Sequence, residues 1–104
     1  MFIHNITFVC SPSDLEEMLS LLREEIIPPL SHNSCRVQMA RVHSQTADSD
    51  AESVSLQFSF ESRNALACWE RDLLAGTLGK FGAAYGQRML FFRTTLETLD
   101  TGIL

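Results

Sequence analysis

Arg93 is the first candidate for a functional residue, because it lies within an apolar run, Met89-Leu90-Phe91-Phe92-Arg93-Thr94-Thr95-Leu96-Glu97. A guanidinium group can bind a carboxylate or phosphate through two parallel hydrogen bonds. It can also be a structural cation, since buried arginines are almost always paired. The pairing habit of buried charges favours the structural interpretation, and binding of a small anionic ligand stays open.

Four uncharged polar residues are further candidates for a ligand-binding or interface region: Asn5, Thr7, Gln57 and Thr95. His4 titrates near neutral pH. It shares strand parity with Ile6 and Phe8, however, which favours a buried histidine with satisfied hydrogen bonds over a general base. An enzyme needs a titratable group near the reacting atom. The candidate face offers no carboxylate, lysine, tyrosine or cysteine, so we predict no catalytic residue.

We predict neither a metal site nor a cofactor. The three cysteines lack C-x-x-C spacing, and no cysteine or histidine pair has metal-ligand spacing. The glycines between residues 76 and 86 lack the pattern of a phosphate-binding loop. Free thiols are typical of a reducing compartment, so the expected location is cytoplasmic.

Length and charge restrict the class of protein. The 104 residues are enough for a single domain, residues 1–104. The net charge is −5 and the eight basic residues form no stripe, which argues against nucleic-acid binding. No apolar run approaches the ~20 residues that span a bilayer, and the N-terminus does not resemble a signal peptide.

The first half of the chain predicts a strand, a helix and a second strand. Residues 2–9 are rich in strand-forming types. A helix begins near Ser11-Pro12, follows an apolar stripe from Leu15 to Ile26, and is expected to stop at Pro28-Pro29. Residues 35–43 form the second strand, and residues 44–52 are the polar tip of a hairpin.

The second half predicts a strand, a second helical region and a last strand. Residues 53–60 alternate apolar and polar side chains, as a half-buried strand does. A helix capped by Ser62 carries an inner stripe that includes Trp69. We expect a bend near Gly76 and Gly79 and then a second short helix, which ends at Gly86, a glycine able to adopt positive φ. Residues 89–97 are the last strand.

The order β-α-β-β-α-β predicts an α+β, ferredoxin-like domain, with a four-stranded antiparallel sheet and both helices on one face. The expected covered face carries Val54, Leu56, Phe58 and Phe60 of the third strand and Leu90, Phe92 and Leu96 of the last. The expected uncovered face carries Ile3, Asn5, Thr7, Val9, Ser55, Gln57, Ser59, Met89, Phe91, Arg93 and Thr95. Its apolar residues predict a homodimer in which two sheets meet face to face.

Four segments carry a resemblance to a known family: Ile3-His4-Asn5-Ile6-Thr7, Glu24-Glu25-Ile26-Ile27-Pro28, Leu56-Gln57-Phe58, and Tyr85-Gly86-Gln87-Arg88 leading into Phe92-Arg93-Thr94-Thr95-Leu96-Glu97. This set resembles a family of short bacterial proteins catalogued as a domain of unknown function. The wider group is the dimeric α/β-barrel proteins, which include cofactor-independent monooxygenases, small-lactone isomerases and haem-degrading enzymes. The resemblance implies the fold and the dimer, and no reaction.

The chain departs from the family at Ile26, where members tend to have histidine, and residues 62–85 contain no histidine. A haem site therefore lacks its iron ligand. Two hypotheses remain. The first is a non-catalytic module that binds a small molecule or another protein. The alternative is a cofactor-independent enzyme, of monooxygenase or isomerase type, acting on a small anionic metabolite between the sheets.

Overall fold

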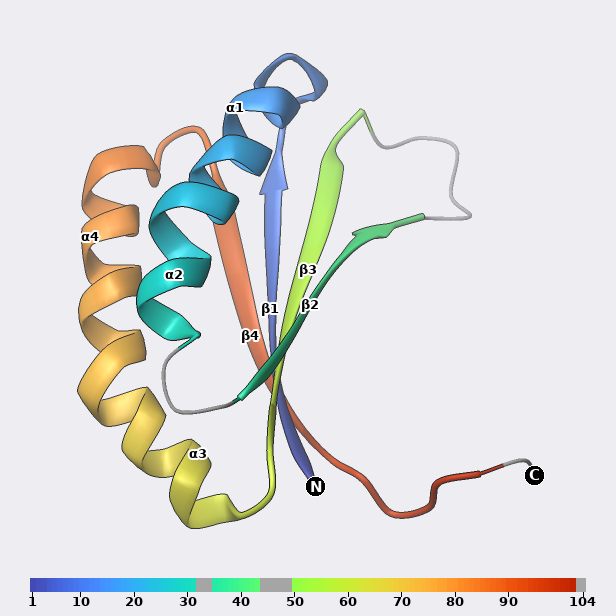
Figure 1. The fold of residues 1–104 in the computed structure, drawn as a ribbon. Helices are drawn as coiled ribbons and strands as arrows, with labels where there is room; N and C mark the ends of the chain where they lie inside the picture. The colour runs from blue at the N-terminus through green and yellow to red at the C-terminus, as the bar shows by residue number, and fades with distance from the viewer. Residues whose placement is uncertain (32–34, 44–49, 103–104) are drawn as a thin grey trace.

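The computed structural model describes residues 1–31, 35–43 and 50–102, arranged as one sheet and one layer of helices (Figure 1). The strands are β1 (Phe2–Cys10), β2 (Arg36–Val42), β3 (Glu52–Phe60) and β4 (Leu90–Glu97), all antiparallel, in the order β2-β3-β1-β4. The first helical segment comprises η1 (Pro12–Asp14), α1 (Leu15–Leu21), η2 (Leu22–Ile26) and α2 (Ile27–Leu30). The second comprises α3 (Arg63–Trp69), η3 (Glu70–Leu74) and α4 (Ala75–Tyr85). The predicted ferredoxin-like architecture is confirmed; residues 44–49 of the predicted hairpin loop lie outside the described residues.

The first helical segment continues past the prolines that were predicted to stop it. The η2 segment is a π-helical turn, in which the N–H of Ile27 bonds the carbonyl of Leu22. Pro28 and Pro29 then stand at the start of α2, where their missing N–H groups are not needed. The helical conformation therefore reaches Leu30.

The second helical segment also differs from the prediction based on its glycines. Its π-helical turn, η3, precedes Gly76, and α4 runs without interruption from Ala75 to Tyr85. Gly86 ends the helix, as predicted, but with φ −60°, so it does not use the positive φ that a glycine can adopt. Its N–H still bonds the Gly82 carbonyl at 2.9 Å, which keeps this glycine within the helical geometry.

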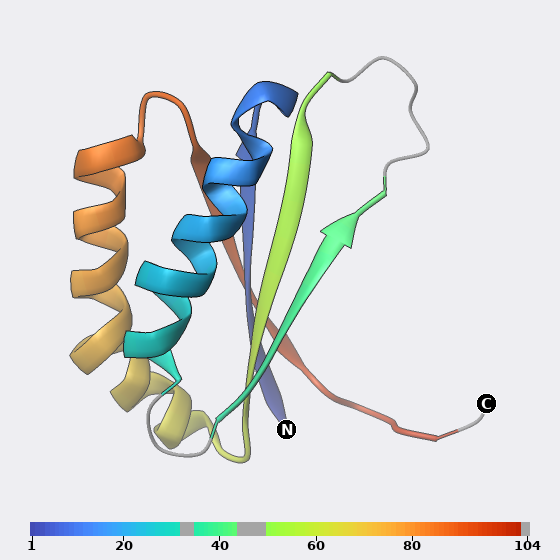
Figure 2. The same ribbon diagram turned by 45° about the horizontal axis from the view of Figure 1, so that its top comes forward.

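The helices cover only one face of the sheet, as both ribbon views show (Figures 1 and 2). The prediction for β3 is confirmed, because Val54, Leu56, Phe58 and Phe60 are buried on that face. Trp69 is also a core residue, as predicted. Its Nε1–H donates to the Leu30 carbonyl at 2.9 Å, so it ties the second helical segment to the end of the first.

The predicted faces of β4 are wrong. Phe91 lies opposite the buried Phe8 of β1, and residues directly opposite one another in an antiparallel pair share a face. One parity of β4 is therefore on the helix side: Met89, Phe91, Arg93 and Thr95. The other parity faces away from the helices and is 55%, 61% and 45% exposed at Leu90, Phe92 and Leu96.

Alternation alone could not reveal this, because both parities of β4 begin with large apolar side chains. Packing decides between them. Met89 is fully buried, and the Phe91 ring centroid lies 6.0 Å from that of Phe8 and 6.3 Å from that of Phe81. Arg93 consequently belongs to the helix-covered side of the sheet. It does not lie on the uncovered face, where it was predicted.

Ser62 caps the second helical segment, because its hydroxyl accepts a hydrogen bond from the N–H of Ala65 at 3.1 Å. The Ser62→Ala substitution should lower the free energy of unfolding by about 1 kcal/mol, since it leaves that N–H without a side-chain partner. Urea denaturation measures the loss. Ser62→Asp keeps an acceptor and should retain the wild-type value; a similar loss in both variants would contradict the role of the cap.

Candidate functional site

Four polar side chains meet on the helix side of the sheet, between β1, β4 and η3: His4, Glu70, Arg93 and Thr95. Nε of Arg93 donates to Nε2 of His4 at 3.1 Å. Nδ1 of His4 lies 3.1 Å from Oγ1 of Thr95 and 3.4 Å from Oε1 of Glu70. Nη2 of Arg93 lies 3.7 Å from Oε2 of Glu70. We call these four residues the His4 cluster.

The contacts of His4 fix its protonation state. A guanidinium group can only donate, so Nε2 of His4 is the acceptor and Nδ1 carries the proton. His4 is 3% exposed. Burial and then the positive charge of Arg93 lower the pKa of His4, while Glu70 acts in the opposite direction. The imidazole is therefore neutral at pH 7, as the interpretation of a buried histidine with satisfied hydrogen bonds requires.

An open hollow of about 440 Å³ borders the cluster. It is lined by Phe2, Arg63, Leu66, Ala67, Glu70 and Thr95. Glu70 and Thr95 belong to both the hollow and the cluster. The guanidinium carbon of Arg63 lies 5.5 Å from the centroid of the Phe2 ring, within the range of a cation–π contact. The hollow thus combines apolar walls, an arginine, a hydroxyl and a carboxylate.

The other three predicted site residues lie together on the uncovered face, which we call the open face. Nδ2 of Asn5 donates to Oγ1 of Thr7 at 3.2 Å, and the Ser55 hydroxyl donates to Oδ1 of Asn5. Gln57 is directly opposite Asn5 on β3. The structure therefore brings Asn5, Thr7 and Gln57 together and separates them from Arg93 and Thr95, which lie across the sheet.

Glu70 was not predicted as a site residue. It directly follows Trp69 of the inner stripe, and that position places its carboxylate at the border between the helices and the sheet. The available signal was His4 itself, because a histidine on the covered parity of β1 needs polar partners from the elements that cover it.

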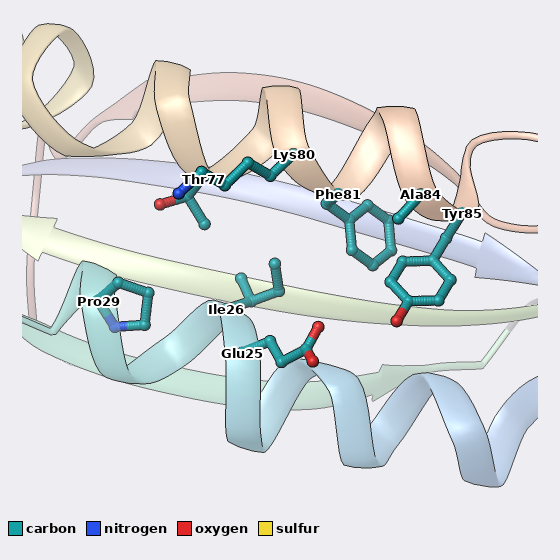
Figure 3. Close-up of a pocket in the computed structure, with 8 residues that line it drawn as sticks. All are labelled: Glu25, Ile26, Pro29, Thr77, Lys80, Phe81, Ala84 and Tyr85. Atoms are coloured by element: carbon teal, nitrogen blue, oxygen red, sulfur yellow. The ribbon is translucent and has the colours of Figure 1, made fainter.

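A second cavity, of about 360 Å³, lies between the two helical segments (Figure 3). The buried Ile26 and Phe81 are among its lining residues. The charged side chains that line it, Glu25 and Lys80, are exposed. No buried polar group among the described lining residues points to a ligand, and we interpret this cavity as a groove between packed helices.

Residues 1–99 match a family described as a domain of unknown function, DUF4286. The chain belongs to DUF4286. This confirms the resemblance found in the sequence. No protein of curated function matches the DUF4286 chain significantly.

Solved structures show the fold of the DUF4286 chain at low sequence identity. An uncharacterised NIPSNAP domain protein from Burkholderia xenovorans aligns with a TM-score of 0.66 and 13% identity over 94% of each chain. A dimeric ferredoxin-like protein from an uncultured marine organism aligns with a TM-score of 0.62 and 12% identity, covering 97% of this chain and 98% of the other. Another protein of that description aligns with a TM-score of 0.60 and 15% identity over the whole of both chains.

None of the described helices is both long and apolar enough to cross a bilayer. No group of three or more histidine, cysteine, aspartate or glutamate side chains in the described ranges is arranged to hold a metal ion.

Proposed function

We propose that this DUF4286 protein is a non-catalytic interaction module that forms a homodimer through the open face of its sheet. The observation that carries this proposal is the near absence of charge on the described open face. Each strand contributes four residues, and Arg36, at one end of β2, is the only charged one. The face comprises Ile3, Asn5, Thr7 and Val9; Arg36, Gln38, Ala40 and Val42; Ser53, Ser55, Gln57 and Ser59; and Leu90, Phe92, Thr94 and Leu96.

This composition is that of an interface rather than of a surface in contact with water. Charged residues make up 20% of the chain, yet a single one lies on this face. Charged groups are depleted and aromatic groups enriched at the centre of protein interfaces. Leu90, Phe92 and Leu96 add an exposed apolar edge along β4.

A second copy of the chain is the partner that we propose. Two identical faces related by a two-fold axis can each bury the other's apolar edge without a complementary charge. The description of two structural neighbours as dimeric ferredoxin-like proteins supports this choice. The family resemblance further supports a bacterial origin, and the free cysteines support a cytoplasmic setting.

Phe92→Lys tests the dimer. Wild-type protein should have a mass of twice the 11.7 kDa chain by light scattering. Phe92→Lys should shift it to the mass of one chain, because two lysines would be buried at the interface without partners. The monomer should stay folded, since Phe92 is 61% exposed in the isolated chain.

Val37→Lys is the matched control. Val37 is 37% exposed, but it lies opposite Phe58 and hence on the helix side of β2. The Val37→Lys substitution should therefore leave the dimer intact. A monomeric wild-type protein, or an undisturbed dimer in Phe92→Lys, would rule out association through the open face.

The ligand site that the sequence suggested between the two sheets is not part of this proposal. It needed Arg93 beside Asn5 and Gln57, and Arg93 lies on the opposite side. The enzymatic alternative loses support for the same reason. The described residues of the open face include no group that titrates near neutral pH.

A further inference from the structure

We propose that the hollow beside the His4 cluster binds a small carboxylate with an apolar body. This site is separate from the open face and does not depend on the dimer. Glu70 is only weakly held within the cluster. Its oxygens lie 3.4 Å from His4 and 3.7 Å from Arg93, whereas charge-assisted hydrogen bonds are about 2.7–2.9 Å long.

Glu70 therefore does not satisfy all the hydrogen-bond donors of the Arg93 guanidinium. The Nε of Arg93 donates to His4, and among the described residues its Nη2 has only the long contact with the Glu70 carboxylate. The side chains of Arg93 and Glu70 are 41% and 34% exposed, so both can be reached from solvent. A carboxylate that enters next to Glu70 competes with it for the guanidinium edge, which presents two parallel donors.

The hollow supplies the remaining contacts. Arg63 lines it and can pair with the same anion, and the Thr95 hydroxyl can donate a hydrogen bond. Phe2, Leu66 and Ala67 offer an apolar wall for the rest of the molecule. With His4 neutral, the cluster and the lining together hold two arginines and one glutamate, so their charge favours an anion over a cation.

Benzoate and benzamide form the test, because the two molecules have the same shape and only benzoate carries charge. Calorimetric titration at pH 7 should show that benzoate binds wild-type protein and that benzamide does not. Glu70→Gln should tighten benzoate binding about threefold by removing the competing carboxylate. Arg63→Gln should weaken it about fivefold; both side chains are at least partly exposed, so the variants should fold.

Two matched variants control for charge alone. Glu24→Gln and Arg71→Gln make the same charge changes at exposed positions that do not line the hollow, and they should leave the affinity unchanged. Binding should also persist in the Phe92→Lys monomer, which separates this site from the dimer. Equal affinity for benzamide, no binding of benzoate at millimolar concentration, or unaltered affinity in both Glu70→Gln and Arg63→Gln would overturn the proposal.

Discussion

Trp69→Ala is expected to lower the free energy of unfolding by about 3–5 kcal/mol, because it empties a site that several core elements share. Trp69 is 5% exposed. Its ring centroid lies 4.9 Å from those of Phe58 and Phe60 on β3, and 5.6 Å from that of His4 on β1. The substitution would also remove the hydrogen bond to the Leu30 carbonyl.

Urea denaturation followed by circular dichroism measures this loss at one fixed protein concentration, since a dimer gains stability with concentration. Trp69→Phe is the informative partner variant. It keeps most of the ring packing and deletes the N–H. Its loss should be about 1 kcal/mol, the net value of one hydrogen bond, because the Leu30 carbonyl still accepts a hydrogen bond from the Cys35 thiol at 3.4 Å. A loss below about 1 kcal/mol in Trp69→Ala would show that the helices do not depend on this residue.

The faces that were predicted correctly are those of strands on which only one parity carries large apolar side chains. On β3, each residue from Ser53 to Phe60 alternates between polar and large apolar, so one face must be buried. On β4 both parities carry large apolar side chains, Leu90 and Phe92 on one and Met89 and Phe91 on the other, so either parity could be buried in the core. In the structure Met89 is buried, and Phe91 packs against Phe8, 83 residues away in the chain, and against Phe81, ten residues away.

The His4 cluster could not be predicted for a related reason. It depends on the register that sets Thr95 opposite His4 and Arg93 opposite Ile6, and a shift of one residue would move both side chains to the open face. It also depends on η3, which brings Glu70 over β1. Asn5, Thr7 and Gln57 needed only the parity of single strands, and their shared face was predicted correctly.

Acidification is expected to destabilise the folded protein through His4. Burial, and then Arg93, hold the pKa of His4 below its ordinary value of 6.5, so the unfolded chain takes up this proton more readily than the folded chain. Stability should therefore be complete above pH 6.5 and fall as the pH drops from there towards the lowered native pKa. Protonation also costs the contact with Arg93, because Nε2 of His4 then has no lone pair to accept the guanidinium N–H.

Variants of the charged groups that face His4 test this origin. As the pH drops from 7.5 to 5, the urea denaturation midpoint of the wild type should fall. That of His4→Gln should stay level, because glutamine has an acceptor for Arg93 and no titrating group. Arg93→Met should reduce the fall without abolishing it, because burial is the larger cause of the lowered pKa. Glu70→Gln should enlarge the fall, since Glu70 opposes that lowering. The carboxyls of Glu17 and Asp72 have pKa values lowered from 4.5 and 3.8, so they contribute only at more acidic pH. A fall that persists in His4→Gln would assign the effect to another group.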